Sequence, residues 1–180
     1  MANILVYTEM GQETVKSVTL EILGKLAGHT LDVVAIGDLS DKAKEDLAKF
    51  GAANIHVIKG DHLGNYSPEG YASALKGFLG SNSYDYVFAG STSLGKDLFP
   101  RLSGEFNAGM ASEVVNFQFE GDQFFGTRPL FAGKCLAKVE IKGPKPHFVT
   151  VRPNALGLPE SPTAGAGSAQ DHSAEASEIR

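Results

Sequence analysis

The chain has 180 residues, of which 42% are apolar and 21% charged, with a formal net charge of -5. This length fits one domain that can bury a core. The basic residues are scattered, which argues against a nucleic-acid-binding protein. The opening MANILVYTE lacks the features of a signal peptide, and no apolar run approaches membrane-spanning length. We expect no membrane insertion and a cytoplasmic location, or the mitochondrial matrix for a mature eukaryotic form.

Short apolar runs alternate with amphipathic stretches over the first hundred residues. The runs predict buried strands at 3–8, 31–36, 55–58 and 84–89. The amphipathic stretches predict helices at 12–26, 41–50, 68–79 and 94–106. Ser40 and Ser67 are expected as N-caps. This alternation predicts an α/β fold, a Rossmann-like parallel sheet with flanking helices. Ligands and partners tend to meet such sheets at the carboxyl ends of the strands.

The pattern changes after Asn107. Further strands are expected at 113–119, 123–128, 134–141 and 147–151. The short turns between them predict C-terminal antiparallel strands, which either extend one edge of the parallel sheet or form a small second sheet. From Gly157 the chain is rich in Ala, Ser, Gly, Glu and Pro. This composition predicts a flexible linker over 157–180, after a folded domain over 1–156.

A glycine-rich turn follows the fourth strand and has the sequence GSTSLGKD, residues 90–97. It lacks one residue of the phosphate-binding pattern G-x-x-x-x-G-K-[ST], because Asp97 stands where a hydroxyl belongs. A carboxylate there would repel phosphate, which argues against a nucleoside triphosphatase. The simplest interpretation is a tight strand-to-helix turn with Thr92 or Ser93 as the N-cap. The alternative is an anion- or adenylate-binding turn formed by Gly90, Ser91, Thr92, Ser93 and Lys96.

Other candidate residues predict no chemistry. The single cysteine, Cys135, has apolar neighbours, so we expect a buried and inert thiol. The five histidines form no local metal-binding pattern, and His56 is expected as an ordinary strand residue. Arg128 and Arg152 each precede a proline, and structural ion pairs are expected for both. We therefore expect no catalytic constellation and no metal site.

Three segments together resemble the N-terminal domain of the electron transfer flavoprotein α subunit. They are GSTSLGKDLFPRL at 90–102, TRPLFAGKCLA at 127–137 and FVTVRPNA at 148–155. The opening NILVYTE and the intervening βα units also match, so the resemblance covers about residues 1–156. It implies a fold similar to the adenine nucleotide α-hydrolases. One departure is Ser112-Glu113, where the family commonly has Ser-Asp, and the longer carboxylate is expected to alter a contact with the partner at most.

The resemblance implies that this domain performs no chemistry of its own. Such an α subunit pairs with a β subunit, and together they carry electrons from acyl-CoA or other dehydrogenases to a quinone oxidoreductase, as in fatty acid β-oxidation. The redox FAD is held by a C-terminal domain beyond the linker, so no FAD-binding residue is expected here. AMP or a second FAD is expected on the partner subunit in many members. The glycine-rich turn is then expected to serve the scaffold and the subunit interface.

The leading hypothesis is thus a scaffold and heterodimerisation domain, and a free-standing adenylate-binding module is the alternative. A phosphate-transfer enzyme that uses the same turn with Asp97 is a third possibility. A domain built to pair is expected to expose an apolar patch. The candidate patch lies in the predicted hairpins and consists of Phe117, Phe119, Phe124, Phe125 and Phe131.

Overall fold

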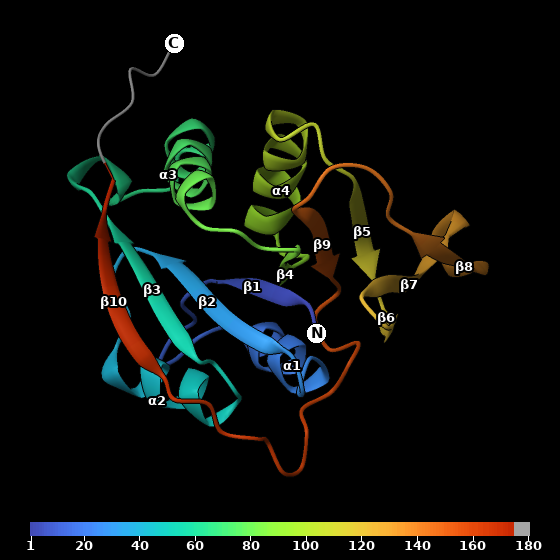
Figure 1. Ribbon diagram of the computed structural model, residues 1–180, viewed down its shortest axis with the longest axis horizontal. Helices are drawn as coiled ribbons and strands as arrows, with labels where there is room; N and C mark the ends of the chain where they lie inside the picture. Colours follow the sequence, from blue (N-terminus) through green and yellow to red (C-terminus); the bar gives the residue numbers. More distant parts are fainter. Residues whose placement is uncertain (175–180) are drawn as a thin grey trace.

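A computed structural model describes residues 1–174 of the chain (Figure 1). Its centre is a seven-stranded sheet in the order β10-β3-β2-β1-β4-β9-β5, and every neighbouring pair is parallel. The strands are β1 (Asn3–Thr8), β2 (Thr30–Ile36), β3 (Asn54–Lys59), β4 (Tyr86–Gly90), β5 (Met110–Val114), β9 (His147–Val151) and β10 (Ser168–Ser173). β4 and β9 are buried at every residue, as expected for parallel strands with both faces covered.

Two helices cover each face of this sheet (Figure 1). α1 (Ser17–Lys25) and α2 (Asp41–Lys49) pack on one face, while α3 (Pro68–Ser81) and α4 (Ser93–Glu105) pack on the other. The short turn η1 (Asp61–Leu63) precedes α3. None of the helices within residues 1–174 is both long and apolar enough to cross a membrane. The predicted Rossmann-like α/β fold is therefore confirmed.

Local sequence signals account for the helix starts. Ser40, Ser67 and Thr92 each accept a hydrogen bond from a backbone N–H of the first helical turn, as N-cap side chains do. The first helix begins at Ser17 rather than at residue 12. The residues before it form a tight turn instead, closed by a bond of 2.6 Å from the Gly11 N–H to the Thr14 carbonyl.

The strands after α4 do not form one antiparallel unit. The predicted strand 113–119 is two strands, because the chain leaves the main sheet after β5 and continues as β6 (Asn116–Glu120) in a second sheet. That sheet is antiparallel and three-stranded, and β7 (Gln123–Leu130) and β8 (Cys135–Glu140) complete it. β9 lies between β4 and β5 and is parallel to both. All five of its residues are buried, which fits this central position better than an edge hairpin.

The segment after Gly157 is not an unstructured linker over its whole length. Residues 168–173 form β10, which pairs in parallel with β3 at the edge of the sheet. An edge strand needs few apolar side chains, because its hydrogen bonds go to the exposed edge of its neighbour. Its polar sequence therefore gave no strand signal. Residues 175–180 of the predicted linker lie outside the described part of the chain, and the boundary near residue 156 stays a prediction.

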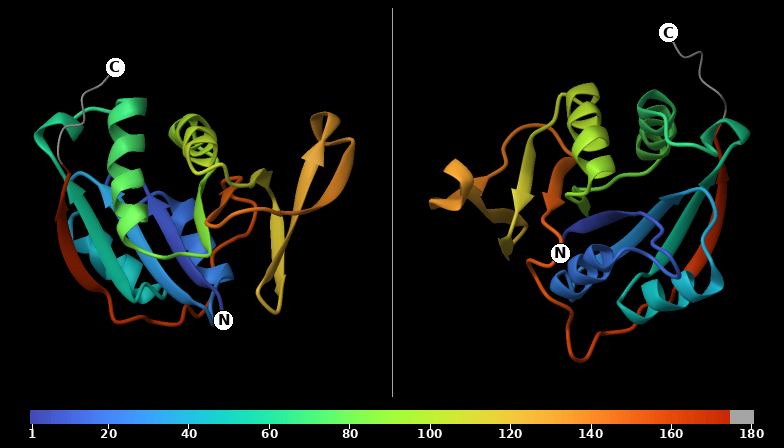
Figure 2. Two further views of the ribbon diagram at one scale, coloured as in Figure 1. Left: turned by 45° about the horizontal axis from the view of Figure 1, so that its top comes forward. Right: turned by 180° about the vertical axis from the view of Figure 1, so that it is seen from behind.

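The antiparallel sheet stands away from the main sheet, with its β7–β8 end outermost (Figure 2). Phe117 and Phe124 are buried, at 4% and 1% exposure, and Phe131 is 78% exposed. Phe119 and Phe125 are half-buried. The expected exposed patch is therefore confined to the turn η2 (Phe131–Gly133) and to Leu136 beside it. Cys135 is exposed, so the prediction of a buried thiol is wrong: β8 is an edge strand with little packed against its outer end.

Candidate functional site

The glycine-rich turn lies where a ligand of an α/β sheet would be expected, at the carboxyl end of β4. Gly90 ends the strand and α4 begins at Ser93. A Cβ atom at Gly90 would collide with Val18, and one at Gly95 would collide with the carbonyl of Gly90. Both glycines are thus required by close packing of the turn, whatever else the turn does.

Two of the predicted binding residues bind a carboxylate of the same chain. The Lys96 Nζ lies 2.6 Å from Glu113 Oε1, and the Ser91 hydroxyl donates to the same oxygen at 3.0 Å. The Arg152 guanidinium bonds the other oxygen, Oε2, at 2.6 Å. The hydrogen bond from Arg152, and after it those from Lys96 and Ser91, lower the pKa of Glu113 from its ordinary 4.5 to about 2. Glu113 is therefore ionised throughout the physiological pH range.

The backbone of Glu113 adopts the position that this network needs. Its φ of 58° is left-handed, which is uncommon for a residue other than glycine. The pairing register of β5 with β9 shifts at the same place, and the Glu113 N–H donates to the Thr150 hydroxyl at 3.2 Å. The irregularity in β5 thus turns the carboxylate towards the glycine-rich turn.

Thr92 joins a second carboxylate. Its hydroxyl donates to Glu9 Oε1 at 2.5 Å while it caps α4, and Lys16 binds the other oxygen of Glu9 at 2.5 Å. Ser93, the remaining predicted binding residue, is exposed. Asp97 accepts a hydrogen bond of 2.6 Å from the Tyr66 hydroxyl. Burial raises the pKa of Tyr66, and this hydrogen bond raises it further.

The turn is therefore surrounded by carboxylates that already bind its donors. A phosphate placed against Ser91 and Lys96 would meet the negative charge of Glu113 and would have to displace it. The arrangement ties β4, β5, β9 and α4 together as an ion-pair network. Sequence reasoning did not identify Glu9 or Glu113 as partners of the turn, because both come from strands distant in the chain.

The two arginines differ from each other. The ion pair expected for Arg152 is confirmed by its contact with Glu113. Arg128 forms no ion pair with a residue of the described range, and its Nε is buried without a hydrogen-bond partner there. No group of three His, Cys, Asp or Glu side chains in residues 1–174 has the arrangement of a metal site.

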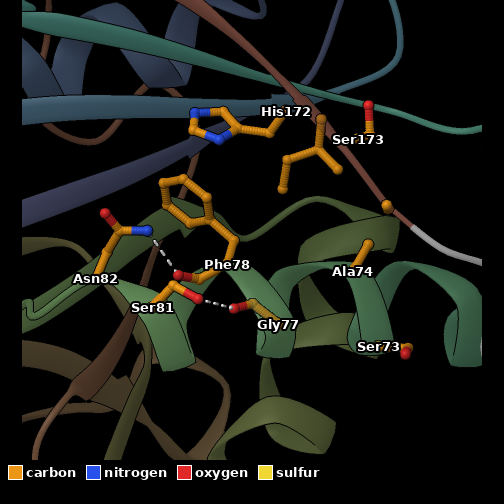
Figure 3. A pocket seen from close by; sticks show the side chains of 10 residues that line it. Ser73, Ala74, Gly77, Phe78, Ser81, Asn82, His172 and Ser173 are labelled. Atoms are coloured by element: carbon orange, nitrogen blue, oxygen red, sulfur yellow. Dashed lines mark hydrogen bonds between the residues drawn. The ribbon is translucent and has the colours of Figure 1, made fainter.

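A cavity of about 400 Å³ lies elsewhere, between α3 and β10 (Figure 3). It is lined by Ile58, Ser73, Ala74, Gly77, Phe78, Ser81, Asn82, His172, Ser173 and Ala174. The Asn82 amide donates to the Phe78 carbonyl at 2.8 Å and the Ser81 hydroxyl to the Gly77 carbonyl at 3.3 Å. No sequence pattern predicts this cavity, because one of its walls is β10, a strand without an apolar pattern.

Comparison with known proteins agrees with this fold. The Bacillus subtilis electron transfer flavoprotein subunit α is 27% identical over 183 aligned residues, which cover 98% of this chain and 55% of that protein. The subunit α of Thermoanaerobacterium thermosaccharolyticum is 30% identical, over 86% of this chain and 49% of that protein. The LctC subunit of the lactate dehydrogenase (NAD(+),ferredoxin) of Acetobacterium woodii is 25% identical, over 87% and 39%.

The chain thus spans about half the length of the curated relatives it matches. A sequence profile described as "Electron transfer flavoprotein domain" matches residues 4–177. This match covers nearly the whole chain, including the glycine-rich turn, the antiparallel sheet and β10. The resemblance drawn from the three sequence segments is therefore confirmed, and the chain belongs to the electron transfer flavoprotein domain family.

Proposed function

We propose that this chain is the scaffold and heterodimerisation part of an electron transfer flavoprotein, acting in the cytoplasm. It performs no chemistry itself and carries electrons only as part of the complex, through an FAD held outside residues 1–174. The observation that carries this proposal is the state of the glycine-rich turn, whose Ser91, Thr92 and Lys96 are bound to carboxylates of the same chain. The names of the relatives, which are electron transfer flavoprotein α subunits, support it.

The proposed partner is an electron transfer flavoprotein β subunit, and the proposed contact is the exposed end of the antiparallel sheet. Phe131 is 78% exposed and Leu136 is 66% exposed. They lie close together, because η2 directly precedes β8. Large apolar side chains on a projecting hairpin suit a protein interface, where burying each is worth about 1.5–3 kcal/mol. AMP or a second FAD, where present, is proposed to be bound by the partner.

The proposed electron donors are acyl-CoA or other dehydrogenases, and the proposed acceptor is a quinone oxidoreductase. Both would act on the complex rather than on this chain. Support for this part comes from family membership and from the name of LctC, which is a subunit of a lactate dehydrogenase.

An adenylate-binding module remains the alternative, and it has less support. Adenylate would have to displace Glu113 from Lys96 and Arg152 at 2.6 Å each. Isothermal titration of the chain with AMP and with ATP separates the two: the scaffold proposal expects no heat of binding, and the alternative expects saturable binding that Lys96→Ala abolishes. Release of phosphate from ATP in the presence of magnesium would support the third possibility, an enzyme that uses Asp97.

The test of the leading proposal is titration of the chain with the electron transfer flavoprotein β subunit of the same source. A saturable 1:1 complex is expected. The double variant Phe131→Ser/Leu136→Ser should bind at least about a hundredfold more weakly, since each of the two side chains contributes on the order of 1.5 kcal/mol or more. The matched control is Leu158→Ser, which removes an apolar side chain that is 55% exposed elsewhere. No binding by the unaltered chain would refute the partner, and equal binding by the double variant would refute the surface.

A further inference from the structure

The edge strand β10 is held by few apolar contacts. Of its six residues, only His172 is partly buried, and the other five are exposed. Its parallel hydrogen-bond ladder with β3 runs from Ser168 to Ser173. Edge segments with little apolar burial lie at the low end of local stability. The contacts of His172 therefore contribute a large share of the free energy that holds β10 on the sheet.

His172 is bonded to a second histidine. Its Nε2 lies 2.9 Å from Nδ1 of His56, which is only 6% exposed. Behind His56 lies Asp32, with Oδ2 at 3.7 Å from the His56 Nε2. That carboxylate also accepts a bond of 2.9 Å from the Tyr84 hydroxyl. Asp32 of β2, His56 of β3 and His172 of β10 thus form a row across three neighbouring strands. The row ends at the cavity beside α3, which His172 lines.

The remaining neighbours of His172 are aromatic or paired. From α3, the Phe78 ring meets the His172 ring edge-on with centroids 5.1 Å apart (Figure 3). From β10 itself, Asp171 is bonded to Lys59 of β3 at 2.9 Å. The charged and titratable groups around the ring are thus His56, Asp32 and Tyr84 on one side, and the Asp171–Lys59 pair on the other.

We propose that the contact between His172 and His56 is a proton-sensitive latch that holds β10 on β3 while the His172 ring is neutral and weakens when that ring gains a proton. The geometry requires one ring nitrogen to donate and the other to accept across 2.9 Å. A proton on His172 places a positive charge on a ring that is partly buried against Phe78 and His56, and water solvates this charge better when β10 is released.

The direction of the pH dependence follows from the state of His172. Burial, and next the charge of His56, lower its pKa, while Asp171 opposes them. Because the pKa of His172 is lower when β10 is docked, the neutral ring favours docking. This contribution is fully present at pH values above the ordinary pKa of about 6.5. Docking weakens as the pH falls below that value, by up to about tenfold in the docked-to-released ratio per pH unit, until the docked ring itself is protonated.

Release would uncover the edge of β3 and one wall of the cavity between α3 and β10. The pH response of β10 does not depend on the proposed function.

The test is amide hydrogen exchange of the ¹⁵N-labelled chain by NMR between pH 8 and pH 5. Protection factors of the β10 amides are expected to fall by up to about tenfold per pH unit below pH 6.5, while those of β1 and β2 stay constant. His172→Gln keeps a side-chain donor near the position of Nε2 but does not titrate, so its β10 protection should be independent of pH. The control is His62→Gln, in η1 next to β3, which should behave as the unaltered chain.

Ring titration followed by ¹³C shifts keeps the test decisive should the glutamine variant release β10 at every pH. The His172 ring is expected to titrate below the ordinary value of about 6.5, in step with the loss of β10 protection. Titration of His172 with β10 still protected would overturn the proposal. So would a transition centred below pH 4.5, which would assign the effect to Asp171.

Discussion

Replacing Glu113 by glutamine tests whether the network around the glycine-rich turn stabilises the fold. The carboxylate binds Lys96, Arg152 and Ser91, and its pKa falls from 4.5 to about 2. A shift of that size corresponds to roughly 3 kcal/mol if fully expressed as stability. Solvent screens part of it, because 26% of the side chain is exposed. We therefore expect Glu113→Gln to lower the free energy of unfolding by about 1–2 kcal/mol at pH 7.

The pH dependence gives a second signature of the same network. A carboxylate with a lowered pKa contributes its stability fully above the ordinary value of 4.5 and loses it as the pH falls towards about 2. The unaltered chain should therefore lose this contribution between these pH values. Glu113→Gln should lack that part of the acid transition, because the amide does not titrate. Urea unfolding at a series of pH values measures both effects.

The matched control is Glu13→Gln. Glu13 also pairs with a lysine, Lys42, at 3.1 Å, but 82% of its side chain is exposed. Such a pair is expected to change stability by less than about 0.5 kcal/mol. Glutamine keeps the left-handed backbone strain at position 113, so strain does not enter the comparison. Equal effects of the two substitutions would show that the Glu113 network adds no stability, and so would an unchanged acid transition in Glu113→Gln.

Two further pairs of substitutions test contacts that the sequence pattern does not show. Gly95→Ala should destabilise the chain by at least about 2 kcal/mol, because the new Cβ would collide with the Gly90 carbonyl. Gly104→Ala in the same helix has open space around its Cβ and should stabilise the chain by about 0.5–1 kcal/mol. Thermal unfolding measures both effects, and a Gly95→Ala variant as stable as the unaltered chain would contradict the close packing of Gly95. Glu21, 2% exposed, accepts backbone N–H groups of the chain after β9 at 3.1–3.3 Å. Glu21→Ala should cost about 2–3 kcal/mol in urea unfolding, against less than about 0.5 for the exposed Glu45→Ala; equal costs would show that these bonds contribute nothing.

The first half of the fold was predictable from local signals. Apolar runs such as Asn3–Thr8 can be buried only between two covered faces, and hydroxyl residues such as Ser40 and Ser67 cap the helices that follow them. These signals lie within a few residues of the structure they cause. The glycine-rich turn was also recognisable as a strand-to-helix turn capped by Thr92.

The second half depends on contacts between distant residues, which one sequence does not display. The position of β9 between β4 and β5 is set by a sheet edge formed about sixty residues earlier, not by its own run of apolar residues. β10 has no apolar pattern, because its backbone pairs with β3 and all of its side chains except that of His172 are exposed. Cys135 lies among apolar neighbours in sequence but at an uncovered strand end in space.

The candidate site shows the same division. Gly90, Ser91, Thr92 and Lys96 could be recognised as one cluster, since they are adjacent in the chain. The contacts of these residues with Glu9 and Glu113 could not be predicted, because Glu9 follows β1 and Glu113 lies at the irregular end of β5, both distant in the chain. A sequence pattern that indicates an anion-binding turn therefore predicts the hydrogen-bond donors but not the group that these donors bind.

The visible absorption spectrum of the purified chain, after incubation with FAD and gel filtration, decides whether residues 1–174 bind flavin. We propose that they position a flavin-bearing complex but hold no flavin themselves. A colourless protein is expected, and the yellow flavin bands should appear only in a complex with the β subunit and an added flavin-binding chain. A protein that stays yellow by itself would refute the proposal and would place a flavin site on this chain, with the carboxyl edge around Gly90 and Lys96 as the first place to look.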